Sequence, residues 1–166
     1  MTLNVPDEFL KTCMSVAWAW DRPHWSAVVQ KLGLIEKAAH VRGQYSRTDY
    51  RNPLGIHTWA QWLSDRVVGL KLELVRWANL EESNREDYER VLRESEAAFS
   101  TVTKHLREVF GSPIFEGRFG EAGFPHDQSA ELLALWQYPS VRMMVQWLHG
   151  GATTPIAVVL VFAPPS

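Results

Sequence analysis

The chain has 166 residues, about the length of one ordinary domain, and 46% of them are apolar, which is enough for a packed core. Seventeen Lys and Arg residues against nineteen Asp and Glu residues give a net charge of −2. This balance disfavours a polybasic binder of nucleic acid or lipid, because such proteins need excess cations to displace counterions from phosphates. We therefore expect no nucleic-acid partner.

Cysteine content and the length of apolar runs predict a cytoplasmic location. Cys13 is the single cysteine, which excludes an internal disulfide framework and a multi-cysteine zinc site. Residues 1–8 lack a cationic start followed by an apolar run, so a secretory signal is not expected. The longest apolar stretch, 156–163, has eight residues, whereas a membrane helix needs roughly twenty. We expect no membrane partner.

Two helices are predicted in the N-terminal part of the chain. Apolar side chains recur at helical spacing over residues 6–20 and predict the first helix. Asp21 is placed to cap a second helix, which is expected to end at Gly33. We expect the two helices to form a hairpin that buries Trp20 and Trp25 at or near its corner.

The segment 34–55 shows no sustained hydrophobic period. It mixes Arg, His, Tyr, Asn and Pro, a composition typical of irregular structure. We expect an exposed loop here, or alternatively a short strand at 41–45. The sequence Asn52-Pro53-Leu54-Gly55 predicts a turn, because proline and glycine favour turn conformations.

A β-hairpin and one long helix are predicted next. Apolar residues alternate over 56–62 and again over 68–74, the pattern of half-buried strands. Ser83 and Glu86 have the spacing of a capping box. An apolar stripe then predicts a helix over about 84–110, which is long enough to cross a sheet and pack on it.

The C-terminal part of the chain predicts β structure. Strands are expected at 114–119, 132–138, 141–148 and 156–162. The last of these is apolar on both faces and is expected to be central in its sheet. We therefore predict one α+β domain over residues 1–166, in which the helix hairpin precedes an antiparallel sheet of five or six strands and the long helix lies across that sheet.

No motif in the sequence predicts catalysis. The six histidines are separated by 16 or more residues, so none has the spacing of a metal-binding pair. The glycines of 117–123 match neither nucleotide-binding spacing. Cys13 lies on the apolar stripe of the first helix, so we expect a buried thiol and not a nucleophile. We expect no enzyme activity, no catalytic residue, no metal and no cofactor.

Acidic and tryptophan residues each allow two interpretations. The carboxylates near the start of the long helix are Glu81, Glu82, Glu86, Asp87, Glu89, Glu94 and Glu96. They predict a solvated helix surface, or alternatively an acidic patch that attracts a basic partner. Most of the eight tryptophans are expected in the core, whereas Trp18 and Trp59 are the best candidates for exposed anchors.

Several stretches of the sequence carry a family resemblance. They are Val109-Phe110-Gly111-Ser112-Pro113, Leu133-Ala134-Leu135-Trp136, Met143-Met144-Val145-Gln146-Trp147 and Val158-Val159-Leu160-Val161-Phe162-Ala163-Pro164. Together with the Trp-rich helix pair and the long helix, they make the chain resemble small α+β immunity-type proteins of actinobacterial-type polymorphic toxin systems. The resemblance implies a cytosolic protein without enzyme activity that binds a cognate toxin domain and blocks its active site.

Two irregular segments, Arg42–Tyr50 and Glu116–Asp127, are the predicted partner contacts, because a tight inhibitor needs a desolvated central anchor. The candidate contact residues are Tyr45, Arg47, Tyr50, Arg118, Phe119, Phe124 and Asp127. Each of them is alternatively an ordinary surface-loop residue. Two other functions stay open: a small-ligand binder or enzyme with a pocket between the long helix and the sheet, and a secretion chaperone for a toxin.

Overall fold

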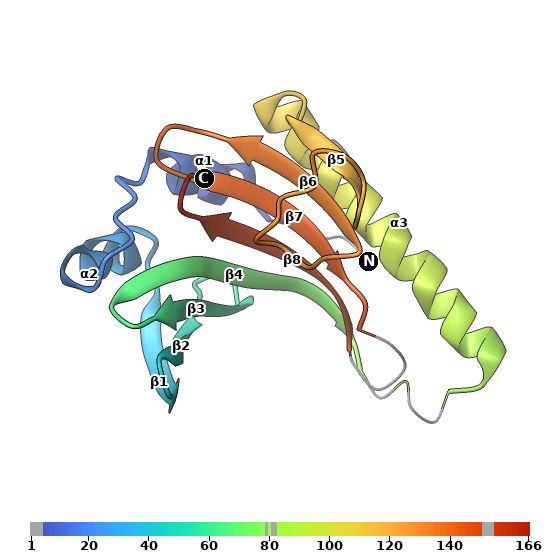
Figure 1. Cartoon of the computed structure of the whole chain (residues 1–166), viewed down its shortest axis with the longest axis horizontal. Helices are drawn as coiled ribbons and strands as arrows, with labels where there is room; N and C mark the ends of the chain where they lie inside the picture. Colours follow the sequence, from blue (N-terminus) through green and yellow to red (C-terminus); the bar gives the residue numbers. More distant parts are fainter. Residues whose placement is uncertain (1–4, 79, 81–82, 151–154) are drawn as a thin grey trace. The chain divides into compact units, whose positions relative to one another are not determined.

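A computed structural model describes residues 5–78, 80, 83–150 and 155–166. Within these ranges lie three helices and eight strands: α1 (Asp7–Ser15), α2 (Arg22–Lys31), β1 (Ile35–Arg42), β2 (Tyr45–Arg51), β3 (His57–Leu63), β4 (Arg66–Trp77), α3 (Arg85–Phe110), β5 (Phe115–Arg118), β6 (Leu132–Gln137), β7 (Arg142–Leu148) and β8 (Ile156–Ala163). The strands hydrogen-bond as an antiparallel sheet in the order β1-β2-β3-β4-β8-β7-β6-β5 (Figure 1).

The α+β class is confirmed, and the predicted number of strands is too low. The two additional strands, β1 and β2, occupy the segment expected to be a loop. They pair in antiparallel register from Ile35 with Arg51 to Arg42 with Tyr45, so the turn lies at residues 43–44. The alternative prediction of a strand at 41–45 is also wrong, because that strand would include the turn.

Backbone contacts divide the chain into two compact units. The first, which we call the N-terminal unit, contains residues 5–72, 137–143 and 161–166. The second, the long-helix unit, contains the described residues of 73–136 and 144–160. Strands β4, β6, β7 and β8 contribute residues to both units. The interpretation of residues 1–166 as one domain stays a prediction.

In the N-terminal unit, the two predicted helices are present, and the first is shorter than expected. Helix α1 ends at Ser15, and the backbone of Val16 is extended. The chain then pairs with the start of β4, where the amide of Val67 donates a 2.9 Å hydrogen bond to the carbonyl of Trp20. Asp21 caps α2 as predicted, since its side chain accepts a hydrogen bond from the backbone amide of His24.

Aromatic packing fills the core of the N-terminal unit. Trp18 stacks between Trp20 and Phe162, at centroid distances of 4.9 and 5.2 Å. Trp25 of α2 meets Trp62 of β3 edge to face at 5.9 Å. Trp18 was expected to be exposed because it lies off the apolar stripe of the predicted first helix. This expectation is wrong, because the helix ends at Ser15 and Trp18 is buried.

The register of β1, β2 and β3 separates the two faces of this part of the sheet. His40 pairs with Arg47 and Arg47 with Gln61, so these three side chains share one face. The opposite face carries the buried Thr48 and Tyr50, which accept hydrogen bonds from the indoles of Trp62 and Trp25. One face is therefore core, and the other carries polar and charged side chains.

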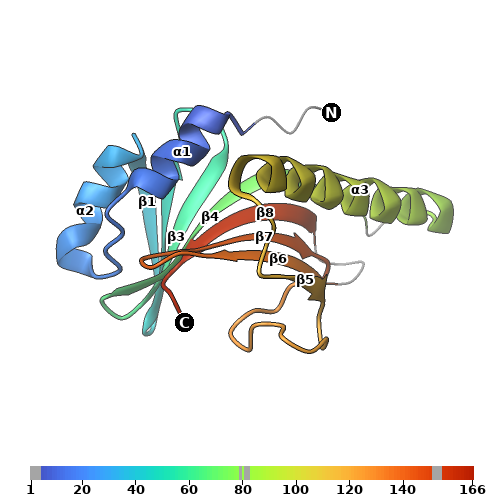
Figure 2. The same cartoon turned by 90° about the horizontal axis from the view of Figure 1, so that it is seen from above.

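In the long-helix unit, α3 packs on strands as predicted. Figure 2 shows α3 along one face of the strands β6, β7 and β8. The indole of Trp147 on β7 donates a 2.9 Å hydrogen bond to Ser95 of α3, and every residue of β8 is buried. The expected central position of this last strand is confirmed. The helix is capped by Asn84 and not by Ser83. Within the described ranges, no helix combines the length and apolarity that a membrane crossing requires.

Candidate functional site

Exposed apolar side chains gather on the strands of the N-terminal unit. Among the described residues, five of the seven large exposed apolar side chains belong to β1–β4: Ile35, Val41, Tyr45, Leu63 and Val68. Val41 is 78% exposed and Tyr45 is 60% exposed. Single exposed apolar residues are ordinary, but a group of them on adjacent strands indicates a contact surface.

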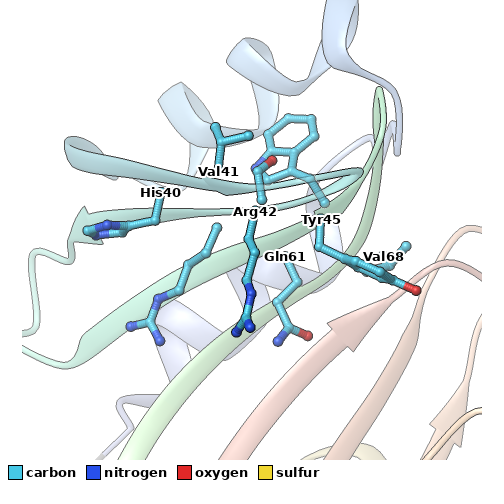
Figure 3. A pocket seen from close by; sticks show the side chains of 9 residues that line it. His40, Val41, Arg42, Tyr45, Gln61 and Val68 are labelled. Atoms are coloured by element: carbon cyan, nitrogen blue, oxygen red, sulfur yellow. The ribbon is translucent and has the colours of Figure 1, made fainter.

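A pocket of about 400 Å³ lies at these side chains. We call it the β1–β4 pocket; its lining residues are His40, Val41, Arg42, Tyr45, Ser46, Arg47, Gln61, Trp62 and Val68. Figure 3 shows Arg42 and Gln61 on one side of the strands and Val41 on the other, as the alternation of a strand requires. A pocket of this size fits a side chain or a small ligand.

Beside the pocket, Asp49 is the centre of a polar cluster. Arg47 donates hydrogen bonds of 2.8 and 2.6 Å from Nε and Nη2 to one carboxylate oxygen of Asp49. His40 lies 3.2 Å from the other oxygen, and His57 lies 3.4 Å from the first. Partial burial alone would raise the pKa of Asp49, but the hydrogen bonds and positive charge of Arg47 lower that pKa below its usual value. Asp49 therefore stays ionised and is fully engaged by its neighbours.

Arg47 is held in place by a second set of contacts. Its guanidinium lies 4.5 Å from the ring centroid of Trp59, a cation–π contact. Its Nη2 also lies 2.9 Å from Nε2 of His57. The expectation that Trp59 is exposed is wrong: its side chain contacts Arg47 and His57 and is 8% exposed.

The pocket lies in a region of positive charge. Between residues 35 and 72 there are six cationic residues, Lys37, Arg42, Arg47, Arg51, Arg66 and Lys71, and three acidic ones, Glu36, Asp49 and Asp65. Burial and the positive charge of Arg47 lower the pKa of Lys71. Among the described residues, Arg42 has no ion-pair partner within 4.0 Å. Its guanidinium therefore supplies a charge that no carboxylate of the described chain compensates.

The first three predicted contact residues all lie on one strand. Tyr45, Arg47 and Tyr50 belong to β2, not to a loop. Tyr45 and Arg47 line the pocket, whereas Tyr50 points into the core and is 4% exposed. The segment 42–50 was expected to be irregular because its mixed composition shows no sustained hydrophobic period. The neighbouring β1 is the edge strand of the sheet, and its exposure on both faces removes the alternation of apolar and polar residues.

The other four predicted contact residues belong to the long-helix unit. Arg118 pairs with Glu96 of α3 at 2.6 Å, and Phe119 is exposed. Phe124 is buried and packs edge to face on Phe119, while Asp127 lies at the surface. The structure therefore separates the two predicted segments into different units and leaves Tyr50 and Phe124 as core residues.

Seven of the nine pocket residues were not among the candidate contact residues: His40, Val41, Arg42, Ser46, Gln61, Trp62 and Val68. Gln61 was predicted to lie on a strand, and its polarity between buried neighbours was the available signal for an exposed face. His40 and Val41 lie on β1, which has no periodic pattern. The pairing of β1 with β2 places His40 opposite Arg47 and Val41 opposite Ser46.

Elsewhere in the described chain, Cys13 and His149 are in structural contacts. Burial raises the pKa of the Cys13 thiol to about 12, so this residue is a core side chain. His149 lies 2.5 Å from the hydroxyl of Tyr88 and stacks on Trp147. Within the described ranges, no group of three or more His, Cys, Asp or Glu residues could hold a metal ion.

Comparisons with known proteins return no match: no family model fits the chain, and neither a curated protein nor a solved structure is significantly similar to it. These comparisons do not test the resemblance to immunity-type proteins, which stays a prediction. The functional argument therefore depends on the exposed, cationic surface of β1–β4.

Proposed function

We propose that this protein binds another protein at the β1–β4 pocket and inhibits it, as an immunity-type protein inhibits its toxin domain. The observation that carries the proposal is the exposure of Tyr45 and Val68 beside Arg42. Tyrosine and arginine are enriched among the residues that dominate binding energy at protein interfaces. An exposed apolar side chain gains free energy when a partner removes it from water.

Binding of a partner protein explains this surface better than catalysis of a reaction does. The polar groups that could act as acid or base are engaged with each other, because Asp49 accepts from Arg47 and also lies within ion-pair distance of His40 and His57. A general base needs a lone pair that is available to the substrate. Asp49 instead holds Arg47 over Trp59, which gives the face a rigid arrangement before a partner arrives.

A protein partner is favoured over a single-stranded nucleic acid. Nucleic-acid binders of this kind stack bases on exposed aromatic rings within a cationic groove. Trp59 and Trp62 are buried, so Tyr45 is the one exposed tyrosine, tryptophan or phenylalanine of the lining, and the imidazole of His40 is engaged with Asp49. The negative charge of Asp49 in the same region would also repel phosphates.

Co-expression with the protein encoded by the adjacent reading frame tests the proposal. We expect the wild-type chain to restore growth to cells that make that protein and to form a one-to-one complex with it in size-exclusion chromatography. The double variant Tyr45→Asp/Val68→Asp should lose both effects, because each carboxylate would be buried without a partner at the interface. Circular dichroism verifies that the variant is folded.

The matched control is Ile114→Asp/Phe119→Asp in the long-helix unit. Ile114 and Phe119 are 66% and 64% exposed, at least as much as Tyr45 and Val68, so the control also replaces two exposed apolar side chains by aspartate. We expect this control to protect cells and to bind like the wild type. Failure of the wild type to bind contradicts the proposal. Binding without restored growth, together with changed export of the partner, would identify a secretion chaperone instead.

A further inference from the structure

We infer that the β1–β4 pocket is a receptor for a single carboxylate, supplied by an aspartate or glutamate side chain of the partner. This inference rests on the proposed function and adds the chemistry of the contact. The receiving groups are the guanidinium of Arg42 and the amide of Gln61, with the hydroxyl of Tyr45 at the pocket wall. A carboxylate accepts hydrogen bonds from all three kinds of donor.

The strand register brings these donors together. Arg42 pairs with Tyr45 across β1 and β2, and Arg47 pairs with Gln61 across β2 and β3. These four side chains therefore lie on one face of the sheet, and Arg42 on β1 and Gln61 on β3, which belong to different pairs, both line the pocket. Figure 3 shows Arg42 and Gln61 extending to the same side of the strands.

The charge of the pocket fits a monoanion. Asp49 compensates the charge of Arg47, whereas Arg42 has no ion-pair partner among the described residues. One carboxylate therefore neutralises the remaining cation without leaving a buried charge. Lys71 lies close enough to Arg47 for that charge to lower its pKa, but it is outside the pocket lining, so Arg42 is the uncompensated cation of the lining itself. A phosphate of charge near −2 would in addition lie near the carboxylate of Asp49.

Apolar neighbours would strengthen the contact once a partner covers it. Tyr45 and Val68 line the same pocket, and both are exposed in the protein alone. When a partner excludes water from these side chains, the local dielectric constant falls and the attraction between guanidinium and carboxylate increases. The acidic residue would then lie at the centre of the interface, with apolar contacts around it.

An NMR titration with a defined acidic peptide tests the receptor directly. The probe is N-acetyl-tetraglutamate amide, and N-acetyl-tetraglutamine amide is its uncharged equivalent. We expect the acidic peptide to shift the Nε–Hε signal of Arg42 and the side-chain amide signals of Gln61, and we expect the glutamine peptide to leave them unchanged. The shifts should decrease as salt is added, because ions screen an exposed ion pair.

Arg42→Gln should abolish these shifts, whereas Arg51→Gln should not. Arg51 is an exposed arginine of β2 that lies outside the pocket lining, so it is the matched control for charge. With the partner protein, Arg42→Gln should weaken binding at least tenfold, and Arg51→Gln should change it less than twofold. Equal shifts with inorganic phosphate or with a thymidine decanucleotide would overturn the assignment to a carboxylate.

The outcomes separate this inference from the proposed function. If the partner binds the wild type and Arg42→Gln equally well, the carboxylate receptor is overturned while the docking function stands. If the acidic peptide binds at Arg42 but the partner does not bind the wild type, the proposed function fails and the preference of the pocket for carboxylates stands.

Discussion

The indole Nε1 of Trp25 donates a 3.0 Å hydrogen bond to the hydroxyl oxygen of Tyr50, which joins helix α2 to strand β2 inside the core of the N-terminal unit. Burial raises the pKa of the Tyr50 hydroxyl, consistent with a core position. Because side chains alternate between the two faces of a strand, the bond that holds Tyr50 in the core leaves Tyr45 and Arg47 on the opposite face of β2.

Tyr50→Phe should therefore lower the free energy of unfolding by about 1–2 kcal/mol, because it leaves a buried indole N–H without an acceptor. Urea denaturation followed by tryptophan fluorescence measures this change. Tyr45→Phe is the matched control: its hydroxyl is exposed, and removing it should change stability by less than about 0.5 kcal/mol. Equal losses in the two variants would contradict the structural role of Tyr50.

Asp49→Asn should destabilise the protein in a pH-dependent way. The pKa of Asp49 is lower in the folded chain than in the unfolded one, so its contribution to stability is present above the unfolded pKa and is lost as the pH falls through the folded pKa. We expect a loss of about 1 kcal/mol at pH 7, from the charged hydrogen bonds of Arg47, and a smaller loss below about pH 4.

Asp65→Asn is the control for this pH dependence. Asp65 pairs with Arg22 at 2.9 Å, but its side chain is 84% exposed, so solvent screens the pair. Its substitution should change the free energy of unfolding by less than about 0.5 kcal/mol at any pH. A pH-independent loss in Asp49→Asn would show that Asp49 acts through packing alone.

Lys71→Met should stabilise the protein at neutral pH. Burial and the charge of Arg47 lower the pKa of Lys71, so the folded state binds its proton more weakly than the unfolded state does. The charge therefore opposes folding below the folded pKa, and this penalty disappears as the pH rises towards the unfolded value. The denaturation midpoint of Lys71→Met should exceed that of the wild type at pH 7, and the difference should shrink towards about pH 10.

The exposed Lys37 provides the comparison for Lys71. Lys37→Met removes the same charge from β1 without relieving a burial cost, so its midpoint should stay within error of the wild-type value. An identical gain in both variants would attribute the effect to net charge and not to the environment of Lys71.

The position of the α3 cap distinguishes two neighbouring residues. Asn84 accepts a 2.9 Å hydrogen bond from the backbone amide of Asp87, whereas the sequence spacing favoured Ser83 and Glu86. Asn84→Ala should cost about 1 kcal/mol of stability, and Ser83→Ala should cost a few tenths at most. Thermal unfolding followed by circular dichroism at 222 nm compares the two variants, and the reverse order would restore the capping-box prediction.

Much of the fold could be predicted from local patterns. The long helix, its end at Gly111, the Asp21 cap and the central strand β8 were all predicted, because each depends on periodicity or on a cap within a few residues. Strands β1 and β2 could not be predicted this way. Strand β1 is an edge strand exposed on both faces, so its sequence shows no alternation of buried and exposed positions. Its hydrogen bonds are made with β2, which comes later in the chain.

The candidate site shows the same division between local and long-range information. Tyr45 and Arg47 were identified from residue type, and the structure places both at the pocket. Gln61 and Val68 are more than a dozen residues away from them, so their place at the pocket depends on the register of β2 with β3 and on the hairpin that follows. Side-chain identity did not indicate that Arg47 and His57 would cover Trp59.

The sequence by itself determined the α+β class, the presence of the helices, the Asp21 cap and the apolar strands, because backbone conformation and local periodicity follow from neighbouring residues. Tertiary structure alone decided which tryptophans are buried and which cations surround the β1–β4 pocket. The physical reason is that burial and electrostatic environment are properties of the atoms brought together by strand pairing, and those atoms come from segments far apart in the chain.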